Sequence, residues 1–313
     1  MTGLDDDAFR VVSWNVEHNG TSNSGDDAKW HLAMDVLAEL RPHVLLRQEL
    51  TRADMFGGRA VWAEAARVGS RMIPFLARAT RESANPTGVY VDRNLLRPIE
   101  FFEHRTSMWH PICNPVVQLS GAARRLSLAS FHLCAFSPAN RAVEAHRLVS
   151  LGKPGLETII GGDCNSYPHR TADEMAPLPD WNLIKDRSHF LHRTIERNGT
   201  RLSDTVPDEI LAGEHDGWAP VFVDLAHHAA TVLGQPEALA PTASLWRQDQ
   251  GPRQRIDRLL ATPRTAQALT RVEVIATDEV VEVSDHALVM ATFSLHGLRR
   301  ALSPATHETA VAA

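Results

Sequence analysis

Eight side chains scattered along this chain have the chemistry of a metal and acid–base site. They comprise four carboxylates, two amides and two imidazoles: Glu49, Asp163, Asp257 and Asp285; Asn15 and Asn165; His132 and His286. Oxygen ligands without thiolates suit a hard cation, Mg²⁺ or Mn²⁺, which usually keeps several waters and a substrate phosphate. Such a cation neutralises and polarises a phosphate, and an aspartate beside a histidine can fix its tautomer so that it serves as a base.

Short apolar runs must position these residues. Three runs end in polar residues, over 11–15, 45–49 and 159–165, and Ser284-Asp285-His286 precedes the apolar run 287–289. His132 and Asp257 lie inside two further strand-like runs. Taken singly, each motif fits an ordinary turn or a core residue. Polar groups that gather from several strand ends at one edge of a sheet indicate a site.

The remaining pattern predicts strands in two series with helices between them. Helices are expected at 29–40, 58–68 and 139–151, and strands at 9–14, 44–46, 72–77, 87–91, 99–104, 114–119, 125–133, 158–160, 255–261, 271–276 and 286–295. The stretch 165–250 reads as loops and short helices over the core. We expect two packed sheets with helices outside, in one domain over 9–297 with a flexible N-terminus (1–8) and a C-terminal tail (298–313).

Composition narrows the class of protein. With 313 residues, 43% hydrophobic and 22% charged, the chain can build a large core, and its net charge of −6 argues against a broad nucleic-acid surface. No apolar run reaches the ~18 residues of a membrane helix, and the acidic N-terminus does not read as a secretory signal. Three scattered cysteines favour no disulfide framework. We therefore expect a cytoplasmic protein.

In this order and strand context, the motifs resemble those of the endonuclease/exonuclease/phosphatase superfamily, which includes DNase I and exonuclease III-type nucleases. The matching segments are Trp14-Asn15, Gln48-Glu49, Phe131-His132-Leu133, Gly162-Asp163-Cys164-Asn165, Arg255-Ile256-Asp257 and Ser284-Asp285-His286. The resemblance spans nearly the whole chain. It implies a DNase I-like four-layered α/β sandwich, with two mostly antiparallel sheets flanked by helices, and metal-dependent hydrolysis of a phosphate ester.

The resemblance also implies roles, position by position. Glu49 corresponds to the principal ligand of Mg²⁺ or Mn²⁺, with Asn15 and Asp285 beside it. His286 corresponds to the histidine that activates the water or contacts the phosphate, and Asp257 orients it. Asp163 and Asn165 correspond to the pair that positions the nucleophile. His132 corresponds to a donor to the phosphoryl oxygen. Whether Asp163 or His286 is the base stays open.

Three positions depart from the family pattern: Arg47, Cys164 and Arg258. None of them removes a catalytic group. The two arginines could alter the cleft, although strand alternation predicts that Arg258 points away from Asp257 and packs outward.

Three functions remain in view. The first is a nuclease-like phosphodiesterase, for which Arg253-Gln254-Arg255 could track a backbone. The second is a small-molecule or lipid-headgroup phosphatase or phosphodiesterase, or a specialised metabolite enzyme on the same metal site, whose pocket the 165–250 stretch would shape. The third is a binding protein that keeps the fold without catalysis. The expected partner is a phosphate ester, nucleic acid or small molecule; no partner protein is implied.

Overall fold

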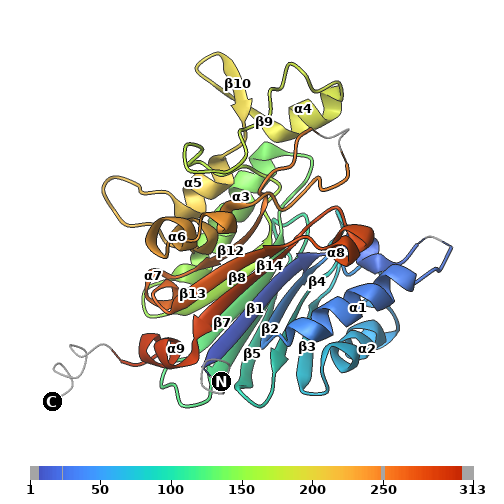
Figure 1. Ribbon diagram of the computed structural model, residues 1–313, viewed down its shortest axis with the longest axis vertical. Coiled ribbons are helices and arrows are strands. Elements are labelled where there is room, and N and C mark those ends of the chain that lie inside the picture. Colours follow the sequence, from blue (N-terminus) through green and yellow to red (C-terminus); the bar gives the residue numbers. More distant parts are fainter. Residues whose placement is uncertain (1–6, 23, 248–250, 305–313) are drawn as a thin grey trace.

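The architecture comes from a computed structural model, which describes residues 7–22, 24–247 and 251–304. Within these residues the strands form two six-stranded sheets, packed face to face, and one two-stranded sheet (Figure 1). The first sheet has the order β13 (Leu269–Ile275), β14 (Leu288–Ser294), β1 (Ala8–Asn15), β2 (Val44–Gln48), β4 (Thr87–Asp92) and β3 (Met72–Ala77). The second has the order β11 (Val223–Asp224), β12 (Asp257–Ala261), β8 (Glu157–Asp163), β7 (Leu126–His132), β6 (Ile112–Leu119) and β5 (Leu96–His104).

Each sheet has one parallel pair near its centre, β1 with β2 and β7 with β8, and the other pairings described are antiparallel. The β7–β8 pair is closely spaced because Gly162 leaves room for it. A Cβ at Gly162 would lie 1.8 Å from the Phe131 carbonyl oxygen, so any side chain there would push the two strands apart. The glycine pair before Asp163 therefore holds the neighbouring strand ends together.

Strands buried on both faces explain the consecutive apolar residues. On β1, Val11 packs between the sheets and Val12 packs under the helices outside; Leu46 and Leu45 divide in the same way on β2. Side chains alternate along a strand, so a continuous apolar run supplies two layers at once. The predicted four-layered sandwich is confirmed.

Helices form the two outer layers. The first sheet is covered by α1 (Ala28–Leu40), α2 (Arg59–Val68) and α8 (Asp278–Val283), and the second by α3 (Pro138–Val149) and α5 (Val206–Ala212). The helices α6 (Leu225–Val232) and α9 (Leu295–Ala301) pack against the central core, and α7 (Pro263–Ala266) lies beside α9. As predicted from Pro138, α3 begins there, with Ser137 capping the Asn140 amide.

The C-terminal boundary differs from the prediction. α9 continues past residue 297, and Leu298 and Leu302 are fully buried in the central core. These leucines are four residues apart, on one face of the helix, and their burial draws the start of the predicted tail into the fold. Residues 1–6 of the predicted flexible N-terminus and residues 305–313 of the tail lie outside the described residues.

The irregular stretch forms a cap of short elements above one edge of the sandwich. It contains α4 (Arg187–Arg193), the hairpin of β9 (Thr194–Arg197) and β10 (Thr200–Ser203), α5, β11 and α6. Figure 1 shows α4 and the hairpin rising above the end of the sheets where β1, β2, β7 and β8 terminate. This cap therefore lies next to the polar strand ends.

Candidate active site

The pleat of four strands directs their polar end residues into the space between the sheets. Val11 on β1 and Leu259 on β12 face the central core, so Asn15 and Asp257, an even number of positions away, face the same way. The same parity applies to His132 on β7 and Asp163 on β8. In register, Asp163 lies beside His132 in the parallel ladder and opposite Asp257 in the antiparallel one.

Asp163 is the centre of the cluster. Its Oδ1 accepts the Asn165 backbone N–H at 2.7 Å, and its Oδ2 accepts from Asn15 Nδ2 at 3.3 Å. The same Oδ2 lies 3.5 Å from His132 Nε2 and 4.0 Å from His286 Nε2. The carboxylate is 2% exposed. The structure thus brings four of the other predicted site residues around the Asp163 carboxyl group.

Asp257 and His286 form a close pair. His286 Nδ1 lies 2.8 Å from Asp257 Oδ2, which also accepts from Thr242 Oγ1 at 2.8 Å. Burial opposes the charged imidazole, but the attraction of Asp257, Asp163 and Asp285 outweighs it and raises the pKa of His286 to about 10. The imidazolium form is therefore favoured at neutral pH, with its Nε2 toward Asp163.

His132 is held neutral. Its burial, together with the positive charges of His286 and Arg193, lowers the pKa of His132 to about 3. Its ring stacks on His110 with centroids 4.1 Å apart, and His110 Nδ1 hydrogen-bonds Ser83 Oγ at 2.7 Å. The cluster consequently contains one charged and one neutral imidazole, both close to the same carboxylate.

Glu49 occupies a strained turn at the end of β2. Its φ is +54°, a left-handed conformation that non-glycine residues seldom adopt. The His18 backbone N–H donates to its Oε2 at 3.1 Å, and burial raises its pKa. Asp285 is 6% exposed, and its Oδ2 lies 3.8 Å from Arg247 Nε.

The donor set fits a hard divalent cation. Asn15 Oδ1 and Asp257 Oδ1 are buried and have no hydrogen-bond partner, which is costly unless something else binds them. Within the described ranges, one group of His, Cys, Asp and Glu side chains could hold a metal: Asp163, Asp257 and His286, whose ligand atoms lie within 4.8 Å of one another. This group differs from the predicted set Asn15, Glu49 and Asp285. Because His286 and Asp257 already bind each other, the predicted oxygen-only set remains the better match to Mg²⁺.

Sequence reasoning missed three residues beside the cluster. Thr242 binds Asp257 and also accepts the backbone N–H of Ile256 and Asp257. Arg247 pairs with Glu17 and faces Asp285. Both come from the irregular stretch, where no periodic signal marks them. His110 precedes a strand as a lone histidine, so nothing in its spacing set it apart.

One arginine offered as a backbone-tracking group is not available for that role. Arg255 is 4% exposed and binds Glu174 with two nitrogens, at 2.8 and 2.5 Å, while its Nη1 donates to Asp224 at 2.8 Å. Its neighbour Arg253 is exposed and donates to the Leu245 carbonyl oxygen. The idea that Arg255 contacts a substrate backbone is wrong, because three carboxylate hydrogen bonds hold its guanidinium.

The departures from the family pattern lie outside the cleft. Arg258 points away from Asp257, as predicted, but it is buried against Asp208 at 3.0 Å under the cap. Arg47 is buried against Glu64 at 2.6 Å, and Cys164 packs among apolar residues outside the second sheet.

The buried contacts that hold the cap are here named the anchor ion pairs: Arg141–Asp204, Arg255–Glu174, Arg255–Asp224 and Arg258–Asp208.

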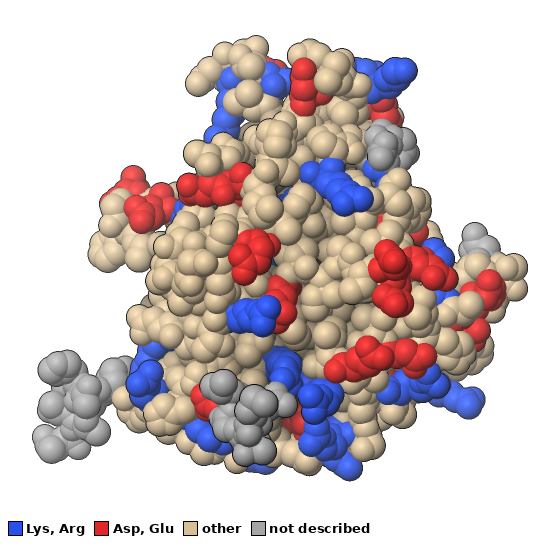
Figure 2. Space-filling view, in the orientation of Figure 1, with Lys and Arg blue, Asp and Glu red and all other residues tan. Residues whose placement is uncertain are grey.

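The visible surface agrees with the composition. On the face in Figure 2, acidic and basic side chains are interspersed, and no broad basic face is seen on that side. Among the described residues, no helix combines the length and apolar character needed to cross a membrane.

Solved structures share this fold, although no protein-family model and no curated protein matches the chain. An AP endonuclease from Archaeoglobus fulgidus aligns with a TM-score of 0.60 and 14% identity, over 91% of this chain and 99% of that chain. D. rerio TDP2, complexed with a single-strand DNA product, aligns with a TM-score of 0.58 and 18% identity, over 91% and 98%. An endonuclease/exonuclease/phosphatase from Bacteroides vulgatus aligns with a TM-score of 0.60 and 12% identity, over 91% and 98%. The chain thus has the DNase I-like fold of the endonuclease/exonuclease/phosphatase superfamily, as its motifs predict.

Proposed function

We propose that this protein is a divalent-metal-dependent hydrolase of phosphate esters, and specifically a nuclease-like phosphodiesterase. The observation that carries the proposal is the convergence of Asn15, Asp163 and the Asp257–His286 pair at one sheet edge, next to Glu49. The fold shared with an AP endonuclease and with TDP2 supports the same class of reaction.

Asn15, Glu49 and Asp285 would hold the cation. Their donors are all oxygen, and the buried Asn15 Oδ1 has no other partner. Bound there, Mg²⁺ or Mn²⁺ would neutralise the charge of a phosphate ester and polarise it for attack.

The protein side chains would then divide the remaining work. Asp163 would act as the base: it takes a proton from water as the new P–O bond forms and the bond to the leaving oxygen breaks. The raised pKa of His286 favours this division, because an imidazole that stays protonated at neutral pH cannot accept that proton. His286 would instead donate a hydrogen bond from Nε2 to the phosphoryl oxygen, while Asp257 accepts from its Nδ1 and orients the ring.

A hydrolysis assay tests this proposal. Purified protein is incubated with Mg²⁺ or Mn²⁺ and labelled single-stranded and duplex oligonucleotides, alongside bis-p-nitrophenyl phosphate and a set of small phosphomonoesters. We expect cleavage of a phosphodiester, and a loss of roughly 10²–10⁴-fold in rate for Glu49→Gln and for His286→Ala. The exposed residues Glu39 and His146 provide matched controls, as Glu39→Gln and His146→Ala.

Two outcomes would change the assignment. If both catalytic variants hydrolyse at the wild-type rate, the site is not the one described. If the oligonucleotides survive while a small ester is cleaved, the protein is a small-molecule esterase rather than a nuclease.

A further inference from the structure

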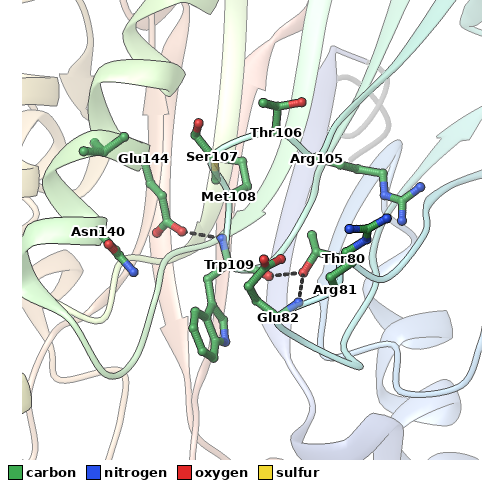
Figure 3. A pocket seen from close by; sticks show the side chains of 11 residues that line it. Thr80, Arg81, Glu82, Arg105, Thr106, Ser107, Met108, Trp109, Asn140 and Glu144 are labelled. Carbon is green, nitrogen blue, oxygen red and sulfur yellow. Dashed lines mark hydrogen bonds between the residues drawn. The ribbon is translucent and has the colours of Figure 1, made fainter.

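A pocket of about 740 Å³ lies outside the set of predicted site residues (Figure 3). Two loops and a helix build it: the β3–β4 loop with Arg81, the β5–β6 loop with Arg105 and Trp109, and α3 with Asn140 and Glu144. Its volume lies within the range of roughly 300–1,000 Å³ that small-ligand sites occupy. None of the predicted site residues lines it.

The pocket joins the active site through two consecutive residues. Trp109 lines the pocket, and the next residue, His110, stacks on His132 with ring centroids 4.1 Å apart. His132 in turn lies 3.5 Å from Asp163. The pocket and the candidate active site are therefore connected through packed, buried side chains.

One side of the pocket carries an aromatic surface. The Trp109 ring meets that of Phe136 edge to face, with centroids 5.5 Å apart at 68°. Phe136 is 53% exposed although it follows the buried end of β7. Trp109 itself is half-buried, and Phe136 lies beside the lining rather than in it. Aromatic faces of this kind can stack on a planar, uncharged group such as a nucleobase.

The backbone of Trp109 is fixed. Its N–H donates to Glu144 Oε1 at 2.5 Å, and its carbonyl accepts from Thr80 Oγ1 at 2.5 Å. Glu144 Oε2 also accepts the Cys134 N–H at 2.7 Å. Both carboxylate oxygens of Glu144 thus accept hydrogen bonds from backbone N–H groups. The buried acid therefore holds the Trp109 backbone in place and is not available to a ligand.

Two arginines at the other end of the pocket are free to bind an anion. Arg81 and Arg105 point to the same end in Figure 3, and both are exposed. Arg105 donates to the Ala79 carbonyl oxygen at 2.6 Å. No acidic side chain in the described part of the chain forms an ion pair with either, although Glu82 also lines the pocket. Unpaired guanidinium groups suit a phosphate.

We propose that this pocket is a nucleotide subsite: Trp109 and Phe136 stack on a base, and Arg81 and Arg105 bind a further phosphate of the same molecule. The inference rests on the proposed function and narrows its substrate class to a nucleobase on a phosphodiester or pyrophosphate chain. It also explains how a protein of net charge −6 can bind a polyanion, since the contacts are local.

Binding to two matched oligomers tests the subsite. One is a 3′-fluorescein tetrathymidylate and the other is the same phosphodiester chain with abasic tetrahydrofuran residues, both titrated by fluorescence anisotropy in the uncleaving His286→Ala background. Trp109→Ala should raise Kd for the base-bearing oligomer at least about fivefold and leave the abasic oligomer within twofold. Arg81→Gln with Arg105→Gln should weaken both.

Matched controls distinguish a loss of stacking from a loss of folded structure. Trp109→Phe keeps an aromatic face and should retain most of the binding, whereas Trp218→Ala removes a remote indole that is 78% exposed and should change nothing. Competition by unlabelled tetrathymidylate and by diadenosine pyrophosphate then ranks a nucleic-acid strand against a free dinucleotide as the source of this chemistry.

The subsite and the proposed function can fail separately. If the wild-type protein hydrolyses phosphodiesters but Trp109→Ala binds both oligomers as Trp218→Ala does, the subsite is overturned and the function stands. If no ester is hydrolysed but binding depends on both the base and Trp109, the subsite stands and the protein binds nucleotides without cleaving them.

Discussion

Asp257 and Arg258 are neighbours on β12, yet they belong to buried charged groups of opposite design. Asp257 faces the space between the sheets, where Asp163, Asp285 and Glu49 accompany one charged imidazole. Arg258 faces the cap, where each anchor ion pair joins a guanidinium to a carboxylate at 3.0 Å or less. One strand therefore separates a cluster of four carboxylates and one charged imidazole from a group in which three guanidinium groups pair with four carboxylates.

The difference also shows in hydrogen bonding. Arg255 uses all three of its donor nitrogens on carboxylates, whereas Asn15 Oδ1 and Asp257 Oδ1 in the candidate active site have no partner. Satisfied buried ion pairs hold elements together, but unsatisfied buried acceptors must be tolerated for another reason. Arg258 Nε in the anchor group also has no hydrogen-bond partner. The pairing of opposite charges, rather than burial, therefore distinguishes the structural cluster from the candidate functional one.

Asp163→Asn should show the contrast most strongly. We expect a loss of roughly 10²–10⁴-fold in kcat, because the base is removed, with no fall in the free energy of unfolding, since the amide oxygen can still accept the Asn165 N–H and one negative charge leaves a crowded site. Steady-state kinetics and urea unfolding measure the two. A stability loss as large as that of an anchor variant would remove the distinction.

Arg255→Met should do the opposite. Removing one member of a buried ion pair leaves Glu174 and Asp224 unpaired, so we expect the free energy of unfolding to fall by about 3–5 kcal/mol. The same substitution at the exposed Arg97 is the control and should stay within about 0.5 kcal/mol. Equal stabilities for the two variants in urea unfolding would show that the anchor ion pairs do not hold the cap.

Cation binding should stabilise the folded protein only through the carboxylates of the candidate active site. Added Mg²⁺ should raise the free energy of unfolding of the wild type by about 1.4 kcal/mol for each tenfold excess over Kd, and EDTA should reverse it. Arg255→Met should keep this increment, and Glu49→Gln should lose most of it. Thermal unfolding at several Mg²⁺ concentrations gives the comparison, and an undiminished increment in Glu49→Gln would argue against that ligand.

The charge on His286 should make the stability depend on pH. Its pKa is raised from 6.5 to about 10 in the folded protein, so its stabilising contribution is full below pH 6.5 and is lost as pH rises through about 10. In cation-free protein, imidazole NMR signals should show His286 protonated at pH 8. Asp257→Asn should lower that pKa and flatten the alkaline fall in stability; Glu39→Gln should not. A neutral His286 at pH 8 would contradict the pairing.

Much of the fold could be predicted because it depends on local periodicity. The runs around Val11 and Leu45 identify strands buried on two faces, and the polar residues that end them fall at one edge by the geometry of parallel strands. The sandwich prediction is confirmed. The structure places Asn15, His132, Asp163 and His286 close together, and the metal and catalytic roles of the site residues stay predictions.

The remainder depends on contacts between distant segments. Thr242 reaches Asp257 from the irregular stretch, and Arg255 reaches Glu174 across 81 residues of sequence. A sequence pattern shows that an arginine is present, but whether it meets a phosphate or a buried carboxylate depends on which loop folds over it. For that reason the sequence alone suggests a substrate contact for Arg255.

Glu49 sets stability against activity at a single position. Its left-handed backbone, at φ +54°, is one that glycine adopts without the cost of about 1–3 kcal/mol borne by other residues. A directed-evolution campaign that scored heat resistance alone would favour Glu49→Gly and would enrich for inactive protein. Screens of variant libraries of this protein should therefore also measure activity wherever position 49 is varied.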